Sequence, residues 1–287
     1  MAKPHQSINP YIALRSLLLP WFESELEVAL TLTPPEKGEG ALLLSISKAS
    51  SIEDLLPLVS EAKGIARFEA VSKLAELAGS GKELEKAVSL LKDPSNEKVS
   101  GDLLIALGKL GLERGVPVAE KIREVFEELP DNVKAQACVV LGVLKDKGAA
   151  DLIWSFLQRS AGNPDLSTAA LIALVDLEDP RANDLVVSTL EKGDFTLEHI
   201  GLAARVGEER AVKRLFELAL LSDDSQVRAA AFNALAYIVK LKGTKPLLPY
   251  LKHRKKPVRK AARQVVKLSK QPLTYFKLLH PPNKELY

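Results

Sequence analysis

The sequence predicts an all-α protein, an α–α superhelix (solenoid) of about seven to eight antiparallel helix pairs. Three observations predict it. An apolar pattern of helical period recurs every 30–34 residues, a shorter amphipathic segment lies between successive copies, and turn residues separate these segments. The composition agrees, because 46% of the 287 residues are hydrophobic but only 5% are aromatic. Small aliphatic residues, mainly Leu and Ala, must therefore build the core.

The recurring pattern places apolar or small residues at offsets 0, 4, 7, 8 and 11 from its first residue. In the clearest copy these positions hold Val227, Ala231, Ala234, Leu235 and Ile238. Because a helix turns by about 100° per residue, the five positions lie within an arc of about 100° and form one buried stripe. The copies begin at positions 66, 99, 133, 166, 197, 227 and 258. They predict seven helices that each bury one face.

A second, shorter helix is predicted between successive copies, in segments such as 83–92, 119–129, 211–221 and 245–252. Turn residues such as Asp93–Pro94 and Gly193–Asp194 separate the helices, and Asp in such turns can cap the helix that follows. Each pair would bury one face against each neighbouring pair, so no pair is expected to be stable alone.

Two successive copies share further residue types with a known repeat family. The matching residues are Asp224, Val227, Arg228, Ala231, Ala234 and Leu235 in one copy, and Val258, Arg259 and Ala262 in the next. On these residues the chain resembles the HEAT-repeat family over about residues 50–270. The segment 178–190 is similar to the short HEAT-like repeats of phycobiliprotein lyases. The resemblance implies that the second helix of each pair lines a concave side. It implies little about function, because the matched positions are packing positions.

Two other repeat families with a similar period fit less well. Tetratricopeptide repeats use aromatic residues at packing positions, which are sparse here, and ankyrin repeats carry a recurring T-P-L-H turn, which is absent. The HEAT-like interpretation is therefore preferred.

The two ends of the chain depart from the pattern. We expect residues 1–50 to form an N-terminal capping segment, residues 51–270 to form the repeat array, and residues 271–287 to form a C-terminal capping tail, with partner binding as the alternative for the tail. Within 25–45 the sequence favours helix but leaves a β-hairpin open, because Val28, Leu30 and Leu32 alternate with smaller or polar residues.

Motifs for catalysis or metal binding are not found. The four His residues are scattered, and the sequence contains no H-E-x-x-H, C-x-x-C, phosphate-binding glycine loop or nucleophile elbow. We therefore expect no enzyme activity, no cofactor and no metal. His199 is interpreted as a surface or partly packed side chain. The aromatics around Trp154 are too sparse for the base-stacking cleft of HEAT-like DNA glycosylases.

The single cysteine and the hydropathy pattern indicate in which cellular compartment the protein is expected. Cys138 lies in an apolar run, cannot form an intrachain disulfide, and is expected to be a buried thiol. No stretch reaches about 18 consecutive apolar residues, and the N-terminus lacks a secretory pattern. A reducing, cytoplasmic location is expected.

Charge is distributed very unevenly behind a net charge of +3. Residues 225–284 hold fifteen Lys/Arg and no Asp or Glu, whereas residues 1–224 hold 25 Lys/Arg and 36 Asp/Glu. The candidate partner-binding residues are Lys252, Arg254, Lys255, Lys256, Arg259, Lys260, Arg263, Lys267 and Arg228. Arg67, Lys134 and Glu198 share one column of the repeat with Arg228 and are expected at exposed positions of the inner helices.

These features predict a non-enzymatic scaffold or adaptor that binds a protein partner, with an acidic surface, through the concave face and the basic C-terminal end. Five alternatives stay open. They are a nucleic-acid-binding module, a surface that lies on anionic lipid, a phycobiliprotein lyase or chaperone-like subunit, head-to-tail self-association of acidic and basic ends, and a merely solvated basic cap.

Overall fold

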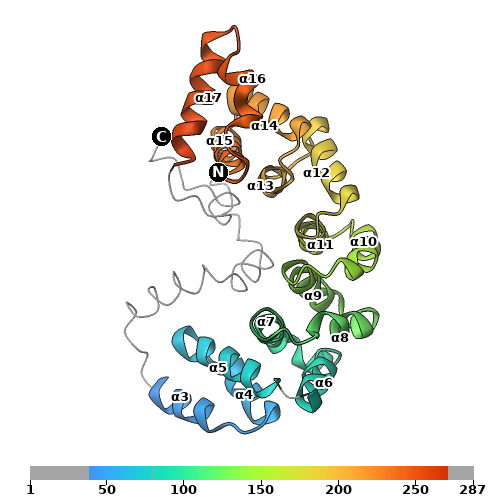
Figure 1. Ribbon diagram of the computed structural model, residues 1–287. Coiled ribbons are helices and arrows are strands. Elements are labelled where there is room, and N and C mark those ends of the chain that lie inside the picture. The colour runs from blue at the N-terminus through green and yellow to red at the C-terminus, as the bar shows by residue number, and fades with distance from the viewer. Residues whose placement is uncertain (1–38, 80, 271–287) are drawn as a thin grey trace, which may run out of the picture. The chain divides into compact units, whose positions relative to one another are not determined.

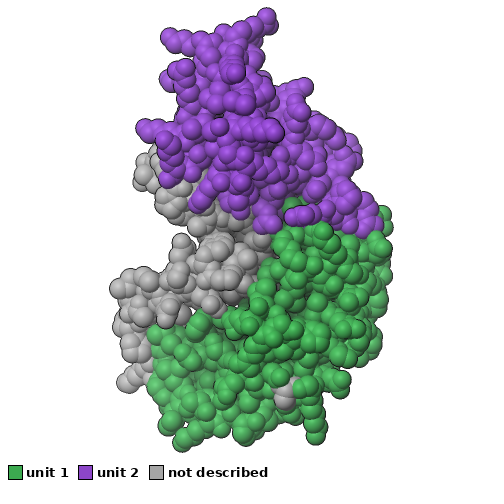
Figure 2. All heavy atoms as spheres, in the orientation of Figure 1, with its two compact units in different colours: residues 1–177 green, residues 178–287 purple. Residues whose placement is uncertain are grey.

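The structure, a computed structural model, describes residues 39–79 and 81–270. These residues form α-helices α3 to α17, four short 3₁₀ segments and connecting turns, and no strand occurs among them (Figure 1). The chain divides into two compact units at Leu177–Glu178 (Figure 2). The predicted all-α class is confirmed for the described part of the chain.

Unit 1 consists of nine described α-helices that pack in two rows. Their bounds are α3 (Glu39–Lys48), α4 (Ile52–Glu61), α5 (Gly64–Leu77), α6 (Gly81–Leu90), α7 (Glu97–Arg114), α8 (Val118–Val125), α9 (Asp131–Val143), α10 (Ala150–Arg159) and α11 (Pro164–Asp176). In one row α3 packs on α5, α5 on α7, α7 on α9 and α9 on α11. In the other row α6 packs on α8, and the rows meet where α4 contacts α5, α8 contacts α9 and α10 contacts α11.

Unit 2 repeats this arrangement with six described α-helices. Their bounds are α12 (Pro180–Lys192), α13 (Leu197–Val206), α14 (Glu209–Leu221), α15 (Ser225–Lys242), α16 (Leu248–Leu251) and α17 (Lys256–Leu268). Here α13 packs on α15 and α15 on α17, while α12 packs on α14. Hairpin contacts join α12 to α13, α14 to α15 and α16 to α17.

The recurring apolar pattern occupies nearly the same place in each helix that carries it. Six of the seven copies start at the third residue of a helix, as Val99 does in α7 and Val227 in α15, and the seventh starts at Leu197, the first residue of α13. The residue four positions later is buried in every copy, from Ala70 in α5 to Ala262 in α17. The apolar stripe therefore faces neighbouring helices, as expected for residues that lie on one side of a helix.

Capping side chains start several of these helices, as the turn residues predicted. Asn163 Oδ1 accepts hydrogen bonds from the N–H groups of Asp165 and Leu166 at 3.1 and 3.3 Å. Asp224 Oδ1 accepts one from the N–H of Gln226 at 2.7 Å. Such caps satisfy N–H groups that have no partner within the helix.

One predicted helix is shorter than expected. The segment 245–252 forms a 3₁₀ turn (Lys245–Leu247) followed by the four-residue α16. Pro246 and Pro249 lack an N–H donor, and proline rings restrict the preceding residue, so a longer regular helix is not formed.

The described part of the N-terminal region is helical. Residues 39–48 form α3, so the helix is confirmed and the hairpin is wrong for residues 39–45. The remaining residues of the 25–45 segment, and the capping tail at 271–287, lie outside the described residues.

The core contains small aliphatic side chains and one thiol. Cys138 on α9 is fully buried, and this burial raises the pKa of its thiol. Gly142, further along α9, faces the backbone of Ala173 on α11 at very short range, so these two helices approach closely. In the described residues no helix combines the length and the apolarity needed to cross a membrane.

Candidate functional site

Seven cations of unit 2 form what we call the basic surface. They are Lys252, Arg254, Lys255, Lys256, Lys260, Arg263 and Lys267. All seven side chains are exposed. The first three lie in the loop between α16 and α17, and the other four lie on α17. The sequence-predicted basic end is therefore accessible on the surface of unit 2.

The four cations on α17 make up the α17 ridge: Lys256, Lys260, Arg263 and Lys267. Their spacings of four, three and four residues keep them within an arc of about 60° on the helix. The ridge spans about 16 Å, given a rise of about 1.5 Å per residue. The buried residues Ala261, Ala262 and Val265 hold the other side of α17 against α15.

Acidic residues do not neutralise the basic surface. None of its seven cations forms an ion pair with a described residue, and residues 225–270 contain no Asp or Glu. By contrast Arg210, elsewhere in unit 2, contacts both Glu191, at 2.7 Å, and Asp184, at 2.9 Å. The basic surface is thus an uncompensated concentration of positive charge.

The loop before α17 shows where this charge departs from the repeat. Asp224 caps α15 through its carboxylate, but the corresponding N-cap of α17 is Lys255, which has no side-chain capping bond. Cations near a helix N-terminus oppose the helix dipole and typically cost about 0.3–1 kcal/mol each. The cations before α17 therefore do not stabilise this helix, and their presence needs another explanation.

Two of the sequence-predicted contact residues, Arg228 and Arg259, form hydrogen bonds within unit 2. Arg228 Nη1 donates hydrogen bonds to the carbonyls of Ser222 and Asp223 at 2.6 and 3.0 Å. Arg259 Nη1 donates in the same way to the carbonyls of His253 and Arg254, both at 2.7 Å. Each arginine closes the loop that precedes its own helix, and each side chain is only half-exposed. We therefore leave Arg228 and Arg259 out of the basic surface.

Two other residues of the predicted column also point to internal partners. Arg67 on α5 binds the buried carboxylate of Asp102 on α7 through two bonds, Nε to Oδ1 at 2.8 Å and Nη2 to Oδ2 at 3.0 Å. Lys134 Nζ lies 3.8 Å from a carboxylate oxygen of Glu127 and 3.8 Å from one of Asp131. These charges connect neighbouring segments of unit 1.

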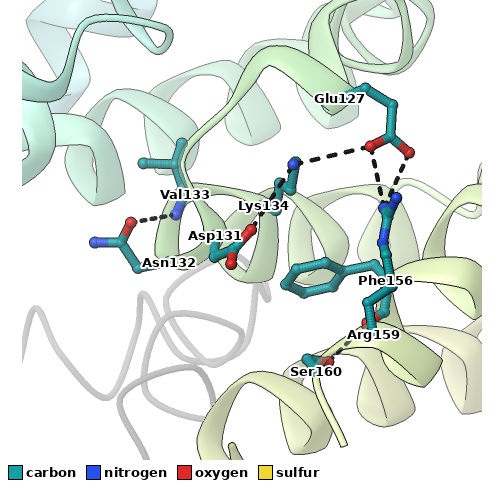
Figure 3. A network of polar contacts seen from close by, with 8 residues as sticks. All are labelled: Glu127, Asp131, Asn132, Val133, Lys134, Phe156, Arg159 and Ser160. Atoms are coloured by element: carbon teal, nitrogen blue, oxygen red, sulfur yellow. Dashed lines mark hydrogen bonds and ion pairs between the residues drawn. The ribbon is translucent and has the colours of Figure 1, made fainter.

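Lys134 belongs to a polar network that the sequence analysis did not identify (Figure 3). Arg159, at the end of α10, donates to both carboxylate oxygens of Glu127 at 3.1 Å, so Glu127 lies between two cations. A pocket of about 460 Å³ beside this network is lined by Lys134, Phe156, Arg159 and Asn163, among others. Because Glu127 and Asp131 balance Lys134 and Arg159, the network carries no excess charge for a ligand.

His199 takes part in capping α13. The backbone N–H of Thr196 donates to Nδ1 of His199 at 3.3 Å, and the Thr196 hydroxyl lies 3.0 Å from the same nitrogen. Burial lowers the pKa of His199, and the nearby carboxylates of Glu198 and Asp194 oppose that effect. The neutral ring, with Nδ1 as acceptor, is therefore the form that fits the folded state.

This geometry predicts a pH-dependent stability that depends on His199. Since the pKa of His199 is lower in the folded chain, its contribution is fully present above the unfolded value of about 6.5 and is lost as pH falls through the folded value. The His199→Gln variant keeps an acceptor at this capping position but cannot titrate. We expect the melting temperature to fall less between pH 7.5 and about 5 in the variant than in the wild type. Equal slopes in scanning calorimetry would contradict this.

Among the described residues, no three His, Cys, Asp or Glu side chains come together as a possible metal site.

Similarity to known proteins does not indicate a function for this chain. Comparison with protein-family models finds no matching family, and comparison with curated proteins finds no significant match.

Proposed function

We propose that this chain is a HEAT-like solenoid that acts as a non-enzymatic scaffold and binds an acidic protein partner through the basic surface. The solenoid is supported by the recurrence of the apolar pattern and by the rows of neighbouring helices within each unit. A preformed surface on packed helices can bind with little folding on association, which suits a scaffold.

One observation carries the binding proposal: seven exposed cations gather where no described acidic residue pairs with them. A merely solvated end would need polar side chains, but not charges of a single sign next to a helix N-terminus. A positive surface of this kind attracts a negatively charged partner and speeds the encounter.

The proposal can be tested by affinity capture from the native host with three versions of the full chain. The wild type is compared with the ridge variant, in which Lys256, Lys260, Arg263 and Lys267 are changed to Glu. The control variant carries the same change of charge at Lys82, Lys98, Lys192 and Lys213, which are exposed lysines outside the basic surface. Arg259 is left unchanged because it closes the loop before α17.

We expect acidic proteins to be retained by the wild type and the control variant and to be lost from the ridge variant. Identical sets of captured proteins from all three would contradict the proposal. The alternative partner is nucleic acid, whose phosphates would also contact such cations. It is eliminated if neither DNA nor RNA binds at about 50 mM salt, where phosphate contacts are strong.

A further inference from the structure

The basic surface lacks the anchors that folded partners use. In residues 252–270 every large apolar side chain is buried or half-buried, and the segment contains no Phe, Tyr or Trp. Stable interfaces between folded proteins concentrate their binding energy in buried aromatic, Arg or aliphatic residues at the centre, and lysine is depleted there. The lysine-rich basic surface therefore does not fit a large, shape-complementary partner.

The surface is equally poor in features that bind nucleic-acid bases. The nearest aromatic residue in sequence, Tyr250, stacks its ring on Phe216 with 3.9 Å between centroids and 9° between planes. That ring is therefore engaged inside unit 2 and does not offer a free stacking platform. Single-strand binding proteins combine cations with such platforms.

The loop before the neighbouring helix α15 differs in charge from the loop before α17. The loop that opens α15 carries the exposed residues Asp223 and Asp224, whereas the corresponding loop before α17 carries Arg254 and Lys255. The cations that precede α17 are thus not continued in the corresponding loop before α15. A long polyanion that continued along successive repeats would meet these carboxylates.

The dimensions of the α17 ridge match an extended peptide. Neighbouring cations four residues apart on a helix are separated by about 6 Å along its axis. In an extended chain, side chains two residues apart lie on the same face and are separated by about 6.6–6.8 Å. Alternate acidic residues of an extended segment can therefore meet cations that are four residues apart on α17. About five residues, three of them on one face, cover the ridge of about 16 Å.

We infer that the basic surface binds a short, extended segment rich in Asp and Glu, which belongs to the acidic partner and is held by charge without an apolar anchor. This inference rests on the proposed function and specifies the part of the partner that is recognised. Because every contact is an exposed ion pair, binding is tolerant of sequence and sensitive to salt.

The test is a titration of fluorescein-labelled peptides with the full chain, followed by fluorescence anisotropy at about 50 mM salt, where screening is weak. The probes are a ten-residue peptide of alternating Asp and Ser, a Gly/Ser peptide of the same length, and a ten-nucleotide thymidine oligomer. The proteins are the wild type, the ridge variant, the control variant, and a milder variant with the four ridge residues changed to Gln. Circular dichroism checks that each variant keeps its helix content.

We expect the Asp/Ser peptide to bind and the Gly/Ser peptide not to bind. The ridge variant should weaken binding at least about 30-fold, the Gln variant should weaken it to an intermediate degree, and the control variant should change it by less than about threefold. Raising the salt to about 200 mM should weaken wild-type binding about tenfold or more.

Three results would overturn the inference: no binding of the Asp/Ser peptide, tighter binding of the thymidine oligomer, or equal losses in the ridge and control variants. Failure here is distinguishable from failure of the proposed function. If capture still retrieves an acidic protein through the ridge but the peptide does not bind, only the extended-segment inference fails. If capture does not depend on the ridge, the proposed function itself fails.

Discussion

Replacing Phe126 by Ala is expected to lower the free energy of unfolding of unit 1 by about 3–5 kcal/mol, the usual range for a fully buried phenylalanine. Phe126 follows α8, is completely buried, and packs edge-to-face on Phe156 of α10 with 6.0 Å between ring centroids. The substitution leaves a cavity and removes a contact between two helix pairs. In thermal unfolding followed by circular dichroism, we expect the transition to shift down by about 10 °C or more.

A suitable control is Leu221→Ala, which also shortens a large apolar side chain. Leu221 is 76% exposed at the end of α14, so little buried contact is lost and the expected change is below about 0.5 kcal/mol. If both substitutions lowered the transition by the same amount, the pair Phe126–Phe156 would not have the role in packing that its burial indicates.

The substitution Gly142→Ala is expected to destabilise unit 1 by about 1–3 kcal/mol, although alanine normally favours a helix over glycine. A Cβ at position 142 would lie 2.8 Å from the Cα of Ala173 and 3.1 Å from its carbonyl oxygen. These atoms belong to the backbone of α11, so the clash cannot be relieved by rotating a side chain. Helices α9 and α11 would have to move apart, which a urea midpoint should detect at unchanged helix content.

Gly40→Ala provides the matched comparison for this second substitution. Gly40 also lies within a helix, α3, but a Cβ there would meet no atom of the described residues within 4 Å. Without a clash the intrinsic preference remains, so the variant should be unchanged or more stable by up to about 1 kcal/mol. A stabilised Gly142→Ala variant would mean that α9 and α11 are not in such close contact.

Much of the fold could be predicted from the sequence because its determinants are local and repeated. Residues such as Val99, Val133 and Val227 recur with apolar partners at helical spacing, and each lies at the third residue of its helix. The short length of α16 was harder to predict, because the apolar residues of 245–252 match those of the other second helices. Only the positions of Pro246 and Pro249 oppose a full helix.

The candidate site was predicted less well, because the sequence does not show where a long side chain ends. Lys260 and Arg259 are adjacent and both cationic, yet the first is exposed and the second bonds to two loop carbonyls. Arg67 is exposed as expected, but it also bonds to Asp102, which is 35 residues away in the sequence. An acidic residue within an apolar helix, as Asp102 is in α7, is the signal that could have revealed a buried partner.

The buried thiol of Cys138 makes this chain unusually simple to label. It is the only cysteine, and both its burial and its raised thiol pKa suppress reaction with maleimides while α9 stays packed. A single cysteine introduced on the exposed side of α17 could therefore carry a fluorophore or spin label without removal of the native one. Conversely, the rate at which Cys138 itself becomes modified would report how often this part of unit 1 opens.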